Sequence, residues 1–534
     1  MKTRKYIFIS LLLVGTFSMA QVGINTDSPN ATLDIKSSSL TTPSNNEGLL
    51  IPKFDNFPST NPTILQDGML VFLTGDGVTS KGFYYWDFPT LTWVPFGGAT
   101  YVEKINDLLD GKSDVDGSED GSSVFLGIDA GDGDDGTDNQ NVGIGFRSLS
   151  DNTNGDSNTA IGYESLSENS IGANNTAIGH HSLKNNVSGN TNTAVGFKAL
   201  FFNVSGSSNT AIGLSSLELN SIGTNNTAVG IRALGENSSG SSNTATGLES
   251  LVLNRGVSAN NVANGYQSLR DNTGDNNVAV GYRASFVNVG ADNIAIGRES
   301  LRNSSGNNNI SIGGDALRVN NTSNNNIAIG VSALQTNVFG DDNIAIGYEA
   351  LVGNSGERNI VLGKQAMNST SNQGNDNIAL GLGAIGANTT GERNVAVGEQ
   401  VMNRNSTGSF NIGHGYRALF KNISGSDNIA IGREAMLENS TGSNNIVIGT
   451  GADTSATSAS NELNIGNTIY GDLSTNNVGI GVANPSEKLE VNGTIKATSI
   501  NFSGLQTFAN DAAASTLSPG DMYKTATGEL RIKL

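Results

Sequence analysis

The chain contains no cysteine among its 534 residues. This absence excludes disulfide bridges, thiolate metal sites, a thiol nucleophile and a lipidated cysteine anchor. Histidine is nearly as scarce: only three occur, and His180 and His181 are adjacent. A histidine-rich metal site and a Ser-His-Asp catalytic arrangement therefore lack their parts.

Basic residues are also few. The chain has 30 Lys and Arg against 49 Asp and Glu, which gives a formal net charge of −19. No cluster of Lys or Arg follows the first residues of the chain. Because proteins bind nucleic acids through basic clusters that neutralise phosphates, this composition argues against a nucleic-acid partner.

Long hydrophobic runs are missing except near the N-terminus. Lys2, Arg4 and Lys5 precede the apolar run Tyr6–Phe17, and small residues lead to Ala20. This order is typical of a secretory signal peptide at residues 1–20, with cleavage after Ala20. The run is shorter than the ~20 apolar residues that a membrane-spanning helix needs, so we predict no transmembrane segment. We expect export, to the cell surface or the medium, from a bacterial cell.

Aromatic residues make up only 6% of the chain, whereas glycine reaches 68 residues. Such a composition lacks the bulk for a large globular core, and a repeat explains it. The motif Asn-x-x-x-Gly occurs 19 times at intervals of 16 to 18 residues. A short fixed period predicts one small unit stacked along an axis. The Asn residues are at positions 141, 158, 175, 192, 209, 226, 243, 261, 277, 293, 309, 326, 343, 359, 377, 394, 411, 428 and 445.

Each repeat predicts a short strand followed by corners. We number the unit from its Asn, so that Asn158 is unit position 1 and Gly162 is unit position 5. Unit positions 2 to 4 alternate β-branched and small residues, as a strand does, and the Gly suits a tight turn. We therefore predict an all-β protein whose main part is a parallel β-solenoid, or β-roll, of about 20 rungs of ~17 residues. The segment around unit positions 8 to 12 fits either a second strand or a helical turn.

The recurring Asn and Gly are interpreted as structural. Asn side chains stacked in register at the ~4.8 Å strand spacing can hydrogen-bond from rung to rung. The predicted ladder and corner residues are Asn158, Asn175, Asn192, Asn209, Asn226, Gly162, Gly179 and Gly196.

Both faces of the predicted strand are apolar. Ile161 and Ile178 share their strands with Ala residues that point to the opposite side. A lone coil would bury one face and leave the other in water, so the second apolar face predicts a partner surface.

The segments Asn158–Gly162, Asn192–Gly196 and Asn343–Gly347 resemble the head repeats of trimeric autotransporter adhesins. The resemblance covers roughly residues 123–450. It implies a left-handed parallel β-roll in a three-chain bundle, and hence a homotrimer. The unit of this chain is longer than is usual in those heads, because it carries an additional segment around unit positions 8 to 12.

A second resemblance lies near the C-terminus. Residues 477–496 look like segments of phage-type tail fibres, and residues 22–35 match 478–491 without a gap. We interpret the similar segments at both ends as the caps that solenoids need. We predict a signal peptide at 1–20, an N-terminal β segment or cap at 21–49, a small aromatic-rich β module at 50–100, an acidic linker at 101–122, the solenoid at 123–466, a tail-fibre-like segment at 467–504 and a C-terminal β-hairpin at 505–534.

Two clusters are candidate binding sites. Trp86 and Trp93 are the only tryptophans, and they either stack on sugar rings or form the core of a small β module; the core interpretation is favoured. Asp114, Asp116 and Asp120 offer oxygen ligands near glycines, which Ca²⁺ favours, but they also suit a solvated acidic linker, and the linker is favoured.

From these patterns we predict a structural fibre with adhesin-like binding to glycans or surfaces, no chemistry of its own and no required cofactor. Three copies would add avidity to weak contacts. A phage-derived, tail-fibre-like receptor-binding protein is the alternative, and a carbohydrate-active solenoid enzyme is a third possibility.

Overall fold

A computed structural model describes residues 22–24, 26, 33–35, 49–74, 81–96, 111–113, 123–134, 139–254, 256–499, 501, 503–509, 513–514 and 516–533. These residues contain many short strands and a single 3₁₀ helix, η1 (Ile64–Gln66), but no α-helix. The chain divides into two units, Met1–Asp107 and Leu108–Leu534. The predicted signal peptide lies outside the described residues.

The first unit holds two small sheets. Strand β1 (Val22–Ile24) pairs in parallel with β2 (Leu33–Ile35). A four-stranded sheet follows, in the order β3 (Lys53–Phe54), β4 (Leu70–Leu73), β5 (Gly82–Asp87) and β6 (Thr92–Pro95). β3 pairs with β4 in parallel, and the other two pairings are antiparallel. We call this four-stranded sheet and its connections the N-terminal module (residues 49–96).

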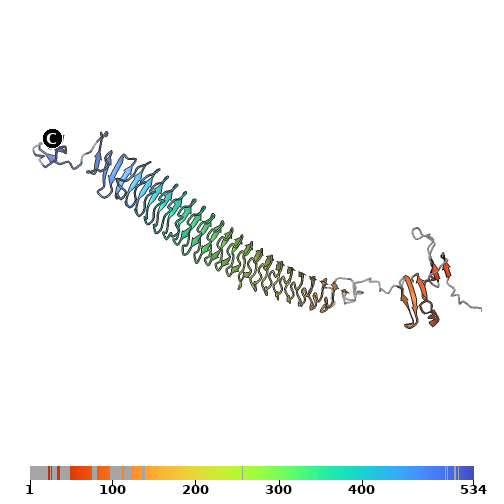
Figure 1. Ribbon diagram of the computed structural model, residues 1–534. Helices are drawn as coiled ribbons and strands as arrows, with labels where there is room; N and C mark the ends of the chain where they lie inside the picture. The colour runs from red at the N-terminus through yellow and green to blue at the C-terminus, as the bar shows by residue number, and fades with distance from the viewer. Residues whose placement is uncertain are drawn as a thin grey trace, which may run out of the picture. The chain divides into compact units, whose positions relative to one another are not determined.

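The second unit is dominated by one long ladder of strands, drawn from brown to blue in Figure 1. It begins with β7 (Gly111–Ser113), which pairs antiparallel with β8. Within the described residues, 21 strands from β8 to β35 then pair in parallel, each in register with the equivalent strand of the next rung. This result confirms the predicted all-β parallel solenoid of about 20 rungs.

The strands of this ladder are β8 (Val124–Leu126), β9 (Val142–Ile144), β10 (Thr159–Ile161), β11 (Thr176–Ile178), β12 (Thr193–Val195), β13 (Thr210–Ile212), β14 (Thr227–Val229), β15 (Thr244–Thr246), β17 (Val262–Asn264), β19 (Val278–Val280), β21 (Ile294–Ile296), β23 (Ile310–Ile312), β25 (Ile327–Ile329), β27 (Ile344–Ile346), β29 (Ile360–Leu362), β30 (Ile378–Leu380), β31 (Val395–Val397), β32 (Ile412–His414), β33 (Ile429–Ile431), β34 (Ile446–Ile448) and β35 (Glu462–Ile465).

The second half of each rung is mainly a series of turns, so neither alternative left open by the sequence describes most rungs. Glu164 and Leu166, at unit positions 7 and 9, have φ of 48° and 52°, and their equivalents repeat this left-handed conformation. Non-glycine residues rarely adopt it. In this solenoid it lets the chain reverse within a few residues and keeps the Leu side chain inside.

Within the part of the array that the structure describes, a second, shorter sheet is confined to the middle, where several rungs have 16 residues. Its strands are parallel and two residues long, at unit positions 11 and 12. They are β16 (Leu253–Asn254), β18 (Asp271–Asn272), β20 (Val287–Asn288), β22 (Asn303–Ser304), β24 (Val319–Asn320), β26 (Thr336–Asn337) and β28 (Gly353–Asn354).

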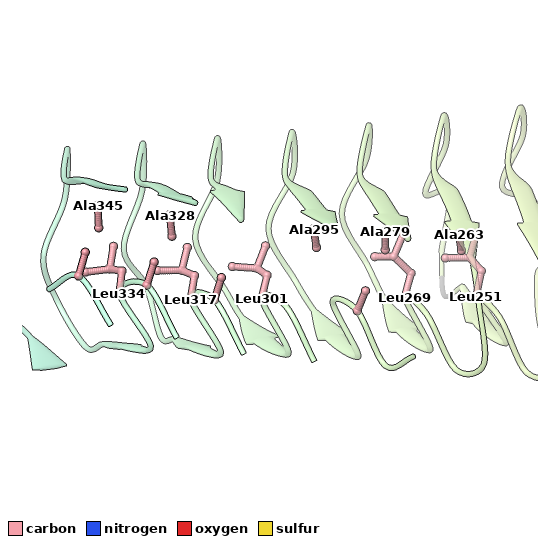
Figure 2. Close-up of a cluster of buried hydrophobic side chains, with 14 of the residues drawn as sticks. Leu251, Ala263, Leu269, Ala279, Ala295, Leu301, Leu317, Ala328, Leu334 and Ala345 are labelled. Carbon is pink, nitrogen blue, oxygen red and sulfur yellow. The ribbon is translucent and has the colours of Figure 1, made fainter. Parts of the chain in front are cut away.

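The core of the coil consists of two layers of side chains, one from each wall. Ala at unit position 3 points inward from the strand, and Leu at unit position 9 of the preceding rung faces it, as Figure 2 shows for Ala279 and Leu269. Ala160 and Leu166 are fully buried, as are their equivalents along the array. A small residue opposite a medium one fills the narrow space, which explains why the composition contains so few aromatics.

The parallel ladder ends at β35. Strands β36 (Ile469–Asp472) and β37 (Asn477–Ile480) continue it antiparallel, and β38 (Leu489–Val491) pairs in parallel with β37. Val478 is opposite Leu489, just as Val22 is opposite Leu33 in β1 and β2, so the two similar sequence segments form the same pairing. A three-stranded sheet follows: β39 (Thr507–Phe508), β40 (Met522–Thr525) and β41 (Leu530–Ile532), with β40 and β41 antiparallel.

Candidate interaction surfaces

The outward side of the long ladder carries half-exposed apolar side chains. In β10, Ala160 is buried while Ile161 is 37% exposed. At the equivalent unit position 4, Ile144, Ile178 and Ile212 are 37%, 39% and 42% exposed, and the other aliphatic residues there are half-buried or exposed to a similar degree. We call the outward side chains at unit positions 2 and 4 of β8 to β34 the strand face. It forms an apolar stripe along most of the ladder.

The strand face changes composition along the array. Unit position 2 is Thr in the six strands from β10 to β15, and Val or Ile in the strands from β17 to β34. The apolar stripe is therefore one column wide in the first part and two columns wide in the second. Thr246, Asn264 and His414 replace the aliphatic residue at unit position 4.

An aromatic column borders the strand face at unit position 6. The rings of Phe146, Tyr163, His180 and Phe197 stack on one another in consecutive rungs, with centroid separations of 5.1, 4.9 and 5.4 Å. Tyr163 and Phe197 are each 44% exposed. The stacking of these rings into one column was not predicted from the sequence. The sequence does carry a signal for the column, because four consecutive rungs have a ring-bearing residue at unit position 6.

The Asn residues at unit position 1 form a continuous buried ladder. The Asn158 Oδ1 accepts hydrogen bonds from the backbone N–H and the Nδ2 of Asn175, at 3.0 and 3.1 Å. The Asn158 Nδ2 donates to the carbonyl oxygen of Gly172, at 2.8 Å. The same pattern repeats at Asn175, Asn192, Asn209 and Asn226. These side chains are fully occupied in holding rungs together, and they offer nothing to a ligand.

A second ladder runs along unit position 12. Asn169 Nδ2 donates to Asn152 Oδ1 at 2.6 Å and also to the Gly172 carbonyl oxygen at 2.9 Å. Gly172 therefore accepts from two Asn side chains of its own rung, Asn158 and Asn169.

The Gly column at unit position 5 is required by close stacking. Gly196 has φ of +135°, and a Cβ placed on it would lie 2.6 Å from the carbonyl oxygen of Gly213 in the next rung. Gly162 and Gly179 are in the same situation. A side chain at these positions would push adjacent rungs apart, so this column too is structural.

The two adjacent histidines lie in different surroundings. His180 belongs to the aromatic column, whereas His181 Nε2 lies 3.2 Å from a Glu164 carboxylate that also binds Lys184 Nζ at 2.5 Å. The hydrogen bond from Lys184 lowers the pKa of Glu164, and burial lowers the pKa of His181. This cluster is an ion pair between neighbouring rungs with a histidine that prefers to be neutral.

Trp86 and Trp93 lie in the core of the N-terminal module. Trp86 is 1% exposed, and Trp93 stacks on Phe57 with the planes 8° apart. The two indoles contact each other edge to face at 5.5 Å. Burial leaves no ring face of Trp86 for a sugar, and the core interpretation accounts for both residues.

The candidate Ca²⁺ ligands Asp114, Asp116 and Asp120 lie outside the described residues. Within the described part of the chain, no group of three or more His, Asp or Glu is placed to hold a metal ion. No helix among those same residues has the length and apolar character needed to cross a membrane.

A cleft of about 550 Å³ lies where the parallel ladder ends. Asp453, Glu462, Tyr470 and Asp472 contribute to its lining. The carboxylates accept hydrogen bonds from nearby backbone N–H groups: Asp453 from Glu438, Glu462 from Ser455 and Asp472 from Ser474. Burial raises the pKa of Asp453. These acids hold the end loops of the solenoid in place.

The comparisons with known proteins bear on the N-terminal part of the chain. Residues 23–110 match the family of phage tail-like trimerisation regions. The match supports self-association of the chain as a trimer. It also supports the predicted resemblance to tail fibres, while the resemblance to autotransporter heads is not confirmed. No curated protein sequence is significantly similar to this chain.

Proposed function

We propose that this protein is an exported trimeric fibre that attaches to glycans or to cell surfaces, with no chemistry of its own. One observation carries the proposal: an uninterrupted parallel ladder from β8 to β35 in a chain whose N-terminal part matches a trimerisation region. A ladder of equivalent rungs supplies length and stiffness, which are the properties of a structural fibre.

In this proposal the three solenoids pack through their strand faces. Water-exposed apolar patches of this extent are uncommon on monomeric proteins. The stripe of Ile161, Ile178 and their equivalents recurs at all rungs except those of Thr246, Asn264 and His414, so three parallel copies can bury it along most of the array. Thr at unit position 2 in β10 to β15 gives the first part of the array a less apolar contact than the second part.

Attachment is proposed to use the surfaces that remain outside this contact. The variable side chains at unit positions 7, 10 and 11 and the aromatic column beside the strand face offer shallow, repeated features. Individual contacts on such a surface are weak, and repetition along the rod in three copies multiplies them. Aromatic faces suit sugar rings, which supports glycans as the ligand class.

Export and localisation at the cell surface or in the medium rest on the predicted signal peptide at residues 1–20. The fibre is proposed to need no cofactor. Binding of Ca²⁺ by Asp114, Asp116 and Asp120 stays a prediction.

A second candidate is a receptor-binding fibre of a phage tail-like particle. The match of residues 23–110 favours it. The two candidates share the trimeric fibre and differ in what the fibre is attached to. Fractionation of the producing cells separates them, because a tail-like particle would sediment as a large assembly, whereas an adhesin would fractionate with the cell envelope or as free fibres.

The trimeric fibre is tested by solution mass and by cross-linking of residues 21–534. Light scattering should give three times the mass of one chain. Because the chain has no cysteine, Ile178→Cys introduces a single thiol on the strand face. A bismaleimide should link chains of this variant into covalent dimers, the largest product that one thiol per chain allows, but not those of the control Glu168→Cys, whose side chain is exposed on another side of the rung.

A monomeric mass would overturn the trimer, and a trimer without Ile178 cross-links would overturn the strand-face packing. Attachment is tested by binding of the trimer to a glycan panel and to whole cells. Absence of binding to every glycan and cell tested would count against the adhesin role.

A further inference from the structure

The four-stranded sheet of the N-terminal module has two apolar faces, only one of which its own residues cover. On the inner face, Val71, Leu73, Tyr84 and Trp86 are buried. Phe54, Phe57 and Trp93 pack against this cluster or beside it. This inner face is the core of the module.

The opposite face carries the alternate residues of the same strands. Leu70, Tyr85 and Val94 are paired across β4, β5 and β6, and Phe72 is paired with Phe83. The backbone N–H of Phe96 donates to the Phe83 carbonyl oxygen at 2.7 Å, which places Phe96 at the end of the second row. We call these six residues the aromatic sheet face: Leu70, Phe72, Phe83, Tyr85, Val94 and Phe96.

The aromatic sheet face is open to solvent within one chain. Phe83 is 45% exposed and Phe96 is 65% exposed, while the other four residues are half-buried. Phe72 and Phe83 contact each other edge to face at 4.9 Å, so their rings form one continuous patch. In a chain with only 6% aromatic residues, four of six side chains on this face are aromatic.

We propose that the aromatic sheet face is the surface through which three copies of the chain associate at the N-terminal module. The inference rests on the proposed trimeric fibre and locates a contact of it. The whole face lies within residues 23–110, the segment that matches a trimerisation region. A large exposed apolar face is costly in water, and burial against equivalent faces of two other copies removes that cost.

A second copy fits this face better than a sugar does. Sugar sites combine a ring face with hydrogen-bonding groups that reach the hydroxyls, whereas the neighbours of these rings are Leu70 and Val94. Three charged residues lie at the edge of this face. Lys53 is paired with Phe72, and Lys81 Nζ lies 5.9 Å from the Phe72 ring centroid. Asp87 is paired with Thr92 and accepts a hydrogen bond from the Thr90 backbone N–H, so its carboxylate is already engaged. An apolar centre with a charged rim is typical of protein–protein contacts.

The test uses single cysteines in residues 21–534. Val94→Cys and Phe83→Cys each place the only thiol of the chain on the aromatic sheet face. The control is Thr60→Cys, an exposed position in the same module and outside the sheet. With a short bismaleimide, the two face variants should give covalent dimers in denaturing gels, because one thiol per chain can join only two chains, and the control should stay at the mass of one chain. Val94→Cys keeps all the aromatic rings, so it answers the question even if Phe83→Cys weakens the module.

Ile178→Cys on the solenoid distinguishes failure of this inference from failure of the fibre. Cross-links at Ile178 without cross-links at Val94 or Phe83 would overturn the aromatic-face contact and keep the trimer. A monomeric mass with no cross-links at any position would overturn both. If no cross-link forms at Val94 or Phe83, labelling of the cysteine in those variants shows why. A cysteine protected from the label would indicate that another segment of the same chain covers the aromatic sheet face. A reactive cysteine would indicate that the face is free for a different ligand. Either result overturns the inference.

Discussion

The N-terminal module and the solenoid maintain their folds in opposite ways. The module relies on a few bulky residues from different strands, with Trp86, Tyr84 and Phe57 in one small cluster. The solenoid contains no tryptophan, and its core consists mainly of Ala and Leu columns such as Ala263 and Leu269 (Figure 2). Each solenoid side chain mostly meets its equivalent in the next rung, and buried Asn ladders add hydrogen bonds between rungs.

This difference predicts how far the destabilisation caused by one substitution should extend in each region. A small core is cooperative, so the loss of one large side chain weakens all of it. In a linear array stability is a sum over rungs and their contacts, so a substitution acts first on its neighbours. The two regions can be followed separately, because both tryptophans lie in the module and fluorescence reports only on it, while far-UV circular dichroism is dominated by the solenoid.

The largest effect is expected for Trp86→Ala. Truncating a fully buried aromatic costs about 3–5 kcal/mol, which is a large fraction of the stability of a small module. The unfolding transition followed by Trp93 fluorescence should move to a much lower temperature or vanish, while the circular-dichroism transition should stay within a degree or two. Trp86→Phe should lower the melting temperature of the module less than Trp86→Ala does. A solenoid transition that shifted with the module would contradict the independence of the two regions.

The Gly column at unit position 5 of the solenoid is tested by Gly196→Val. The added Cβ would meet the Gly213 carbonyl oxygen, and φ of +135° is strained for any β-branched residue. We expect a loss of about 1–3 kcal/mol from backbone strain alone, seen by circular dichroism and not by tryptophan fluorescence. The matched control is Gly314→Ala, because a Cβ at Gly314 meets nothing within 4 Å. Equal destabilisation by both variants would show that the close stacking is not the cause.

The buried ladder is tested by Asn209→Ala. The substitution removes the donor to the Gly223 carbonyl oxygen and the acceptor for the Asn226 backbone N–H. Leaving buried groups without partners costs about 1–3 kcal/mol. Hydrogen exchange measured by mass spectrometry should increase in the rungs on either side of residue 209. Asn303→Ala, on an exposed side chain of β22, should leave exchange unchanged. If the Asn226 backbone amide kept its protection from hydrogen exchange in this variant, the Asn ladder would not contribute to the stability of the rungs.

The smallest effect is a gain, from Ser304→Asn. Ser304 interrupts the second ladder: Asn320 Nδ2 donates to the Ser323 carbonyl oxygen at 2.7 Å, but towards the preceding rung it meets the Ser304 Oγ, at 3.3 Å, in place of an amide oxygen. Asn288 and Asn320 are paired with residue 304 in the same register, so an Asn there occupies an equivalent position. Restoring the hydrogen bonds should stabilise the array by about 1 kcal/mol, measured as a higher melting temperature or denaturant midpoint. A neutral or lower value would mean that the neighbouring rungs have adapted to the serine.

Much of the solenoid could be predicted from the sequence because its rungs are local and repeated. The period placed the strand at unit positions 2 to 4, and the alternation in Thr159–Ile161 predicted that Ala160 and Ile161 face opposite sides. The second half of the rung could not be predicted, because Leu166 adopts a left-handed conformation that its residue type disfavours. Only the surrounding coil enforces it.

The candidate sites were predicted less well. The choice between a core and a sugar platform for Trp86 depended on which strands pair with β5, and residue spacing carries no such information. The aromatic sheet face was missed for the same reason. Phe72, Phe83 and Phe96 are separated along the chain, and they become one patch only through the register of β4, β5 and β6.

The sequence by itself determined the repeat, the parallel all-β solenoid and the residue columns, because a unit that recurs every ~17 residues must place like residues above one another. Three features follow only from the tertiary structure. The Gly172 carbonyl joins two Asn ladders, the middle rungs form a second sheet, and the N-terminal sheet has an exposed aromatic face. Those features depend on contacts between residues distant in the chain, and packing and hydrogen-bond geometry set such contacts.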